Sequence, residues 1–435
     1  MAFQQGLSGL ASSSRALDVI SSNVANSSTV GFKASNAVFA DTFASAMGGG
    51  VSNLQVGMGA NTIAVRQSFT QGATTTTNNP LDMAIGGNGF FLIERNNGTP
   101  AYSRNGQFNL DKDGYIVTPQ GERLMGYQTQ NVDGSVSFVG STTPRSIQVP
   151  PTGIGAKATT ELAVRANLDS ATAVPVDGTF SPNNPNSYSY TTSAAVYDSL
   201  GNQHSLSMFF VKQPAPAANT WTVYRTFDGT ALSPDTPGTT TPLVPGSYAS
   251  VADIVFNSGT GTFDVVATGA DNPVAVSVLA ADLGTGADPL SFALNLDKMT
   301  QRATDSAVYE TIQDGSPPGE LASISVSADG IVQGRYTNGE TRDLGKVILS
   351  TFRNPNGLVS LGDNLWAATI ESGQAALAGP GEGLNGTIGS GRVEESNVDM
   401  SQELVNMIIQ QRNYQANAQS IKTQDQILQT LINLR

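Results

Sequence analysis

Cysteine is absent from this 435-residue chain, and histidine occurs once, at His204. Without cysteine the chain has no disulfide, no thiolate nucleophile and no thiolate metal ligand. A single histidine leaves few of the nitrogen ligands that transition metals prefer. We therefore expect no metal site and no cofactor, and we expect stability to come from packing rather than from covalent links.

Positive charge is also scarce, with 22 Lys and Arg against 35 Asp and Glu and a formal net charge of −13. Binding to nucleic acid or to anionic membranes needs clustered basic side chains, and no such cluster occurs. No run of about 18 apolar residues is present, so no segment is expected to cross a membrane. We therefore expect no nucleic-acid partner and no membrane insertion.

The first basic residue is Arg15, so the N-terminus lacks the charged region that precedes the apolar core of a secretory signal. We expect the protein either to stay in the cytoplasm or to leave by a route that reads an uncleaved terminus. The length predicts two or three domains. The 39% of hydrophobic residues fall into periodic segments, which is typical of a folded chain.

The N-terminal segment has the pattern of an amphipathic helix over about residues 3 to 26. Apolar residues recur every seven positions, with Leu7 and Ile20 nearby: Phe3, Leu10, Leu17 and Val24. Residues from Asn26 to Gly31 favour caps and turns and should end the helix.

The C-terminal segment carries a longer stripe of the same kind. Its members are Met400, Met407, Tyr414, Ile421 and Leu428, with Leu404, Ala418 and Ile432 four positions further on. Cap-like oxygens at Asp399 and Ser401 mark its start. The narrow stripes on both helices hide little surface alone, so each helix should become stable when neighbours cover it. Both helices carry few charges, and this composition favours assembly through the helix seams.

Between the helices the pattern changes to short alternating segments and Gly-containing turns, which predicts β-structure. Two β-rich stretches, one near residues 84 to 127 and one near 321 to 352, flank a Thr/Pro/Gly-rich β segment. That segment contains a predicted hairpin, AAVYDSLGNQHSLSMFFV, at 194 to 211. The order predicts a multidomain fold in which an α-helical coiled-coil terminal region is joined to mainly β, nested and discontinuous outer domains.

The predicted division is a nested one. Residues 1–33 and 398–435 form the terminal helical assembly domain, 34–80 and 371–397 are connecting segments, 81–149 and 311–370 form a β body domain, and 150–310 form an inserted outer β domain.

Four patterns could carry chemistry. Asp198, Ser199 and His204 all lie in one predicted hairpin, whereas a catalytic triad needs residues that converge from separate elements. We interpret Leu200 to Asn202 as a tight turn and assign no catalytic residue. The run from Asp111 to Gly114 opens like a calcium loop, but Tyr and Ile occupy the next required positions, so a turn is expected.

The other two patterns also favour a structural reading. Residues 381–386 match G-x-G-x-x-G, but we expect no strand before them and no helix after them, so we interpret them as a flexible linker. Glu394 and Glu395 could be a carboxylate pair, but consecutive residues rarely face one target, and we expect both to be solvated. None of the four patterns is interpreted as a catalytic or ligand-binding site, so we predict that the chain is not an enzyme.

The end of the first predicted helix reads VANSSTVGFK at 24–33. This segment resembles the signature Asn-x-x-Thr-x-Gly-[Phe/Tyr]-Lys of bacterial flagellar rod and hook axial proteins. LDMAIGGNGFFL at 81–92, YSRNGQF at 102–108, DGYIV at 113–117 and EESNVDM at 394–400 resemble further family motifs in the same order. VYDSLG at 196–201 resembles the hairpin of the hook type. We assign family-motif roles to Asn23, Asn26, Gly31, Phe32, Lys33, Asn397, Tyr197, Asp198 and Gly201.

The resemblance implies a structural subunit that polymerises into a flexible, curved tube, the universal joint that transmits torque from rod to filament and encloses the export channel. It implies type III export without a cleaved signal, location in the flagellum outside the cell, and partners that include other copies, the distal rod protein, the hook cap and the hook–filament junction proteins. A distal rod protein is the alternative within the family. A secreted β-rich adhesin or protease is the alternative outside it.

Overall fold

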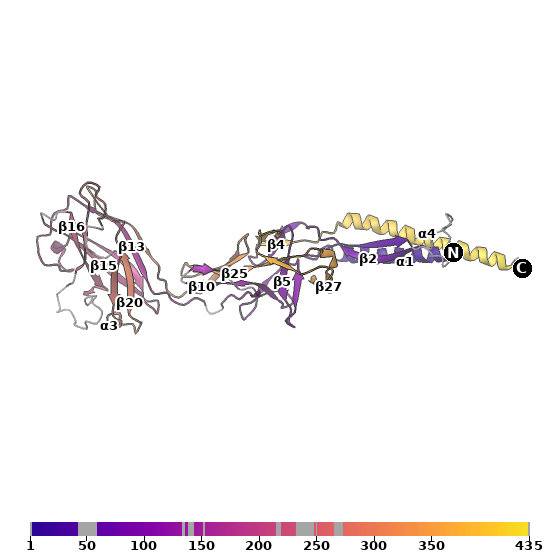
Figure 1. Ribbon diagram of the computed structural model, residues 1–435, viewed down its shortest axis with the longest axis horizontal. Coiled ribbons are helices and arrows are strands. Elements are labelled where there is room, and N and C mark those ends of the chain that lie inside the picture. The colour runs from indigo at the N-terminus through magenta and orange to yellow at the C-terminus, as the bar shows by residue number, and fades with distance from the viewer. Residues whose placement is uncertain are drawn as a thin grey trace. The chain divides into compact units, whose positions relative to one another are not determined.

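The computed structural model describes residues 2–41, 59–132, 135–137, 143–150, 153–214, 219–231, 248, 250–264 and 273–433. The chain forms two compact units. Unit 1 contains residues 1–151, 323–335 and 341–435, and unit 2 contains 152–322 and 336–340. Helices occupy the chain ends and strands occupy the middle (Figure 1), which confirms the predicted fold class.

Unit 1 begins and ends with its two long helices, α1 (Ala2–Ala25) and α4 (Met400–Asn433). α4 starts at a side-chain cap, because Asp399 Oδ1 accepts hydrogen bonds from the backbone N–H groups of Ser401 (2.9 Å) and Gln402 (3.1 Å). At 1.5 Å per residue, its 34 residues span about 51 Å. α1 is followed by an antiparallel ribbon of β1 (Ser35–Asp41) and β2 (Ala60–Gln67), whose register shifts after Val38.

The body of unit 1 is a mainly antiparallel sheet in the order β23-β24-β25-β9-β5-β6-β28-β27. Its strands are β5 (Phe90–Glu94), β6 (Pro100–Ser103), β9 (Arg123–Gln128), β23 (Leu321–Val326), β24 (Ile331–Tyr336), β25 (Thr341–Val347), β27 (Val359–Gly362) and β28 (Leu365–Ala367). Shorter strands pair beside this path: β7 (Asn109–Leu110), β8 (Ile116–Val117), β12 (Arg145–Ser146), β26 (Leu349–Thr351) and β29 (Ala376–Ala378). An aromatic cluster of Phe69, Phe90, Tyr102, Phe352 and Trp366 packs edge to face in its core.

Two-stranded ribbons complete unit 1. They pair β3 (Thr74–Thr76) with β31 (Arg392–Glu394), β4 (Met83–Gly86) with β30 (Thr387–Ser390), and β10 (Gln130–Val132) with β11 (Ser135–Ser137). We call the segment that follows α1 the N-terminal arm and the segment that precedes α4 the C-terminal arm. The first two ribbons join a strand near the N-terminal arm to a strand near the C-terminal arm. Both arms are therefore tied to the body by backbone hydrogen bonds.

Unit 2 consists of two five-stranded sheets that share one hydrophobic core, which includes Leu162, Leu206, Trp221 and Phe292. One sheet contains β14 (Tyr190–Tyr197), β15 (Gln203–Lys212), β16 (Thr220–Phe227), β17 (Thr230–Ala231) and β18 (Ser250–Val255). The other contains β13 (Glu161–Asp169), β19 (Val274–Val278), β20 (Leu290–Asn295), β21 (Thr300–Arg302) and β22 (Ala307–Gln313). A one-turn helix, α3 (Ala280–Leu283), and short 3-10 turns at Pro185–Ser187 here and Pro355–Gly357 in unit 1 lie between strands.

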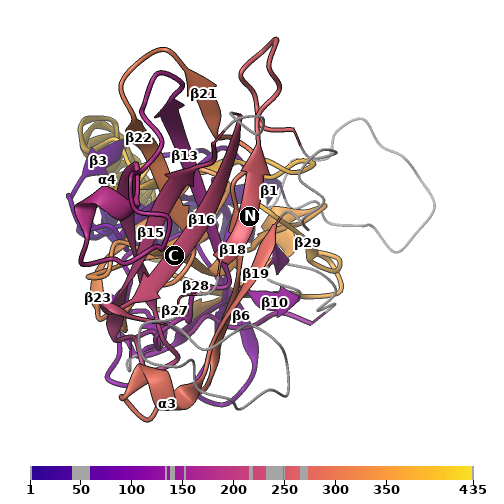
Figure 2. The ribbon, with the colours of Figure 1, turned by 90° about the vertical axis from the view of Figure 1, so that its left-hand side faces the viewer.

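The predicted hairpin at 194 to 211 is confirmed, because β14 and β15 pair antiparallel from Tyr190 with Phe210 to Tyr197 with Gln203. β15 also pairs with β16 on its other side (Figure 2). The predicted loop at 381–386 needs a correction. A strand does precede it, since β29 ends at Ala378, and the loop is a hydrogen-bonded turn in which Gly381 N donates to Gly386 O (2.9 Å). The segment after it is the strand β30, so the loop has no helix N-terminus with which to hold a phosphate.

Candidate functional site: paired terminal helices and a buried junction

The two terminal helices of unit 1 pack against each other in antiparallel fashion (Figure 1). Three contacts fix the register: Gly6 lies against Ile421, Gly9 against Asn417, and Asn23 Nδ2 donates to Glu403 Oε1 (3.0 Å). As the residue number rises by 17 from Gly6 to Asn23 on α1, that of the partner falls by 18 from Ile421 to Glu403 on α4, as expected for antiparallel helices. α4 therefore continues beyond the start of α1.

The seam between the helices is built from small and polar side chains. The buried residues of α1 are Gly6, Ser13, Ala16, Ile20 and Asn23, of which Gly6 and Asn23 contact α4 directly. Their spacings of seven, three, four and three residues place them on one helix face. A Cβ atom on Gly6 would lie 2.9 Å from the Ile421 side chain, so the absence of a side chain lets the helices approach closely.

The large apolar residues of the predicted α1 stripe lie beside this seam and not in it. Phe3 and Leu7 are exposed, and Leu10, Leu17 and Val24 are half-buried. On α4, Met407, Ala418 and Ile421 are half-buried, whereas Met400, Leu404, Tyr414 and Leu428 are exposed. The side chain of Ile432 lies outside the described part. The role of these residues in assembly stays a prediction.

Asn23 joins α1 to two other elements. Its side-chain amide donates to Ser35 O (2.8 Å) and to Glu403 Oε1, while its Oδ1 accepts from Ser35 N (2.9 Å). The side chains of Asn23 and Glu403 are both buried. This network holds the start of β1 and the first turn of α4 against the end of α1, which gives the predicted motif residue a structural role.

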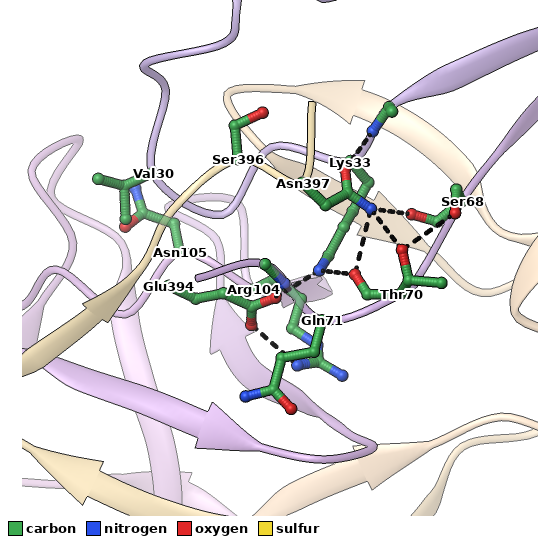
Figure 3. Close-up of polar contacts among 12 residues, drawn as sticks. Val30, Lys33, Ser68, Thr70, Gln71, Arg104, Asn105, Glu394, Ser396 and Asn397 are labelled. Atoms are coloured by element: carbon green, nitrogen blue, oxygen red, sulfur yellow. Dashed lines mark hydrogen bonds and ion pairs between the residues drawn. The ribbon is translucent and has the colours of Figure 1, made fainter. Parts of the chain in front are cut away.

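A buried cluster of three charged residues lies where the chain leaves the helices and enters the body (Figure 3). Glu394 on β31 is fully buried, and its Oε1 accepts from Lys33 Nζ (2.5 Å) while its Oε2 accepts from Arg104 Nη1 (2.9 Å). Lys33 follows α1, Arg104 follows β6, and Glu394 precedes α4. The cluster therefore joins the N-terminal arm, the body and the C-terminal arm at one point.

Further hydrogen bonds compensate for the burial of these charges. Lys33 Nζ donates to Thr70 O (2.7 Å), Arg104 Nη2 donates to Gly87 O (2.7 Å), and Glu394 Oε1 accepts from Gly72 N (2.9 Å). Burial lowers the pKa of Lys33 below its ordinary value, although the hydrogen bond and attraction of Glu394 oppose the shift. Burial likewise lowers the pKa of Arg104 against the attraction of Glu394. One carboxylate thus stabilises two buried cations, and without it both would lack a counter-charge.

The neighbouring motif residues support the same junction. Gly31 N donates to Glu394 O (2.8 Å), and Gly31 has a left-handed φ of 72°. A Cβ atom there would lie 2.6 Å from Asn105 N, so glycine is required both by conformation and by space. Asn397 Oδ1 accepts from Ala34 N (2.7 Å), and its Nδ2 donates to Ser68 O (2.8 Å). Asn397 thereby ties the two arms together beside the charges (Figure 3).

Two more predicted residues flank the junction. Asn26 lies at the end of α1, where its Nδ2 donates to Ser22 O (2.9 Å) and its Oδ1 accepts from Thr29 Oγ1 (3.2 Å). Phe32 is half-buried. The structure therefore gathers Gly31, Lys33 and Asn397 at one junction through shared partners: Gly31 and Lys33 both donate to Glu394, and Lys33 and Asn397 both donate to Thr70 O. Asn23 and Asn26 lie on the adjoining helix.

Tyr197, Asp198 and Gly201 lie apart from this junction, in the β14–β15 turn of unit 2. Asp198 Oδ1 accepts from Leu200 N (2.9 Å) and Asn202 N (2.8 Å), and Gly201 has a φ of 85°. Burial opposes ionisation, but hydrogen bonds from Asn202, Thr285 and His204 hold the pKa of Asp198 well below its ordinary value. The Asp198 carboxylate therefore stabilises the turn formed by Leu200 to Asn202, which was predicted to be a tight turn.

The possible triad in this turn is not assembled. His204 Nδ1 lies 2.7 Å from Asp228 Oδ2, and its Nε2 lies 3.3 Å from Asp198 Oδ2. Ser199 Oγ accepts from Asp288 N (3.0 Å). Both ring nitrogens of the histidine thus face carboxylates, and neither is directed at the serine.

The prediction that Glu394 is solvated was wrong, and it is the main residue that the sequence reasoning missed. Glu395 is exposed and bonds Thr75, so the two neighbours do face different targets. A signal was present: two motif segments each contain one cation, Lys33 and Arg104, and a third contains an acid. Pairing of opposite charges between motifs could have located the cluster.

Two kinds of feature do not occur among the described residues. Within them, no group of three or more His, Cys, Asp or Glu could hold a metal ion. No helix in the described part is long and apolar enough to cross a membrane.

Comparison with known proteins places these features in a family. Four family models match: "Flagella basal body rod protein" at 3–33, "Flagellar hook protein FlgE/F/G D1 domain" at 84–167, "Flagellar basal body protein FlaE D2 domain" at 167–316, and "Flagellar basal body rod FlgEFG protein C-terminal" at 390–434. The flagellar hook protein FlgE of Escherichia coli is 42% identical over 100% of both chains. That of Borreliella burgdorferi is 31% identical over 99% of this chain and 98% of its own.

A solved structure is also similar. The crystal structure of Helicobacter pylori flagellar hook protein FlgE2 matches 72% of this chain and 98% of that chain, with 15% identity and a TM-score of 0.49.

Proposed function

The chain belongs to the flagellar hook protein family, and from this premise we propose that its paired terminal helices build the wall of the hook tube. It is a structural subunit of the bacterial flagellar hook, located in the flagellum, which polymerises with other copies of itself. The observation that carries the helix assignment is the number of large apolar side chains left uncovered on α1 and α4. Among the described residues, ten of them are at least one-third exposed: Phe3, Leu7, Met400, Leu404, Val405, Ile408, Ile409, Tyr414, Ile427 and Leu428.

Such exposure is costly for a subunit that stays monomeric. Each large apolar side chain gains about 1.5–3 kcal/mol on full burial, so ten half-covered side chains amount to a strong drive for association. Because the α1–α4 seam itself consists largely of small and polar groups, pairing the two helices within one chain leaves this drive unsatisfied. Neighbouring copies can satisfy it.

The junction gives the helices a mechanical connection to the body. Torque must pass from the tube wall to the outer parts of each subunit, and a flexible linker would dissipate it. The buried Lys33–Glu394–Arg104 cluster and the Asn397 hydrogen bonds tie both arms to the body at one place. We infer that this junction is the stiff element of the subunit.

The rod alternative is less well supported than the hook. Relatives named hook protein align with the whole chain, including the middle segment that carries the Asp198 turn. A family model for that segment matches residues 167–316. The relatives are structural proteins, and we propose no enzymatic activity.

We also propose specific partners for the subunit. They are the distal rod protein, the hook cap, the hook–filament junction proteins and the type III export apparatus, which would export the chain without cleavage. The sequence-derived division into a terminal helical domain, connecting segments, a β body and an inserted outer β domain is proposed with them.

Complementation tests this function. The chain is expressed in a motile bacterium that lacks its own hook subunit, and basal bodies are isolated and imaged. We expect curved hooks and restored swimming from the full chain, and neither from a variant that lacks residues 2–25. Straight extensions of the rod would favour the rod alternative, and export without any polymer would contradict the proposal.

A further inference from the structure

The buried junction of Lys33, Arg104 and Glu394 holds more positive than negative charge. Each of the three side chains is at most 3% exposed, and both cations pair with the same carboxylate. Within the residues that the structure describes, neither cation has a second carboxylate partner, since Glu395 bonds Thr75 instead. With all three groups ionised, one buried positive charge is therefore left without a counter-charge, which is costly away from water.

Lys33 is the one member of the cluster that can relieve this imbalance. An arginine side chain keeps its proton in proteins, so Arg104 stays charged. Both oxygens of Glu394 accept hydrogen bonds from N–H groups, which suits a carboxylate, because its oxygens are acceptors only. A lysine, in contrast, readily loses its proton when it is buried.

The hydrogen bonds of Lys33 match the number of N–H groups on an amine that has lost its proton. An ammonium has three N–H donors, and a neutral amine has two. In the described part of the chain, Lys33 Nζ has two acceptors, Thr70 O (2.7 Å) and Glu394 Oε1 (2.5 Å), as Figure 3 shows. The loss of one proton therefore leaves both hydrogen bonds in place and costs the junction no contact.

The surroundings of Lys33 act in the same direction. Burial lowers the pKa of Lys33, and the nearby charge of Arg104 adds to this effect, whereas the hydrogen bond and charge of Glu394 oppose it. Gln71 and Asn397 are the other polar side chains drawn at this place, and neither carries a charge. The balance of charges and the number of acceptors thus indicate the same residue.

We propose that Lys33 is a pH-sensitive group of the junction: as the pH of the surroundings rises, the folded subunit releases the Lys33 proton and keeps a balanced Arg104–Glu394 pair. An unfolded lysine keeps its proton up to about pH 10.4. Between the folded and the unfolded pKa, the unfolded chain therefore binds one proton more than the folded chain, so the stability of unit 1 rises with pH. The connection of both arms to the body becomes more stable in alkaline surroundings.

A titration followed by nuclear magnetic resonance tests the proton release directly. The chain is labelled with ¹³C at the lysine ε-carbons, and the Lys33 signal is identified by its absence from Lys33→Arg. Lys112 is exposed and provides the internal reference. We expect the Lys33 signal to titrate at a lower pH than the Lys112 signal. A Lys33 signal that titrates together with Lys112, or at a higher pH, would overturn the proposal.

Two substitutions test the effect on stability. Lys33→Met removes the proton site and leaves the balanced pair, whereas Lys33→Arg fixes the extra charge, because a guanidinium keeps its proton. The measurement is the urea midpoint of unit 1 from about pH 7 to about pH 10. It is followed by the fluorescence of Trp366, with Trp221→Phe in every chain compared.

We expect the midpoint of the chain with Lys33 to rise with pH relative to both variants, and Lys33→Met to be at least as stable as that chain at pH 7. Lys112→Met and Lys112→Arg are the controls, and their differences from the same chain should not change over this range. A difference from Lys33→Met or Lys33→Arg that stays constant with pH would show that side-chain fit, and not proton release, sets the effect. That result would contradict the proposal.

Discussion

Glu394 is the residue on which both arms of unit 1 depend. It is fully buried between Lys33 and Arg104, and each of these cations has lost its water. Breaking a buried ion pair by removing one partner is strongly destabilising, because the partner that remains is a buried, unpaired charge. Here one substitution would leave two such cations.

We therefore predict that Glu394→Gln destabilises unit 1 by about 3–5 kcal/mol. The measurement is the urea midpoint of the free subunit, followed by circular dichroism and by tryptophan fluorescence, with Trp221→Phe in every chain compared so that Trp366 in unit 1 is the one remaining tryptophan. The matched control is Glu395→Gln, since Glu395 is exposed and lies next in the chain. Equal midpoints for the two variants would show that the cluster is not a stabilising junction.

Asp314 gives unit 2 a defined acid dependence. Burial opposes its ionisation, but hydrogen bonds from Thr160 and Glu161 and the ammonium of Lys157 lower the pKa of Asp314 from 3.8 to about 2. A folded-state pKa below the unfolded value contributes stability that is fully present above the unfolded pKa and is lost as the pH falls through the folded one.

We predict that Asp314→Asn lowers the melting temperature of the chain at pH 7 and at pH 5. The difference from the unaltered chain should shrink as the pH falls from about 4 to about 2, where the natural carboxyl also becomes neutral. Calorimetry at a series of pH values measures it. A difference that stays constant down to pH 2 would mean that the Asp314 carboxylate is not the cause.

Some residues could be found from the sequence and others could not. Gly31, Lys33 and Asn397 were recognisable because the motif segments repeat a family pattern, and the structure brings them together. Glu394 was misjudged because a carboxylate beside a second carboxylate suggests a solvated pair. Its burial depends on Lys33 and Arg104, which lie 361 and 290 positions away, so no local pattern encodes it.

At the scale of elements, small and polar residues make the closest contacts between α1 and α4, at Gly6, Gly9 and Asn23. Larger apolar residues stay exposed, and we propose that they make the contacts between chains. Ile421 has a place in both, since it packs against Gly6 and belongs to the predicted assembly stripe. Leu428 lies beyond the start of α1 and is half-exposed.

We predict that Ile421→Glu or Leu428→Glu abolishes polymerisation and leaves the β-structure folded. Each change would place an uncompensated charge in an apolar contact. Gln419→Glu, at an exposed polar position of the same helix, is the control and should still polymerise. Sedimentation gives the fraction of the protein in polymer. Far-ultraviolet circular dichroism reports the secondary structure, including the strands. Loss of the β signal would show that body and helices do not fold independently.

A second prediction for the same helices concerns the free subunit. The seam offers little apolar burial, so we expect residues 3 to 26 to be weakly protected from hydrogen exchange in the monomer and strongly protected in the polymer. Exchange followed by mass spectrometry compares the two states. Strong protection of this segment before assembly would show that the helix pair is stable without neighbours.

Helix positions were predictable because the seven-residue repeat is a local pattern, and α1 and α4 occupy the expected segments. Which face meets which partner was not predictable. The apolar repeat from Phe3 to Val24 marks the hydrophobic face of α1, whereas the close approach to α4 is made by Gly6 and Gly9. A glycine and serine face gives no hydrophobic signal, although it permits the closest packing.

At the scale of the whole molecule, unit 2 is a separate body with its own core and is inserted into the sequence of unit 1. We predict that replacing residues 152–320 by a short Gly-Ser linker leaves a subunit that still polymerises but forms straighter tubes or tubes of altered curvature. The helices that we propose to drive assembly both belong to unit 1, so the tube wall should persist. Curved hooks identical to those of the full chain would refute a role of unit 2 in curvature, and a complete failure to assemble would show that unit 2 is needed earlier.

The central claim is that the terminal helices form the wall of a polymeric tube. Electron cryo-microscopy of the tube polymerised from the purified full chain tests it most directly, because the map locates each helix by radius. The predicted result is a continuous inner layer made of α1 and α4 from successive copies, with the β units outside it. A tube whose inner wall is made of strands, with the helices at the outer radius, would contradict it.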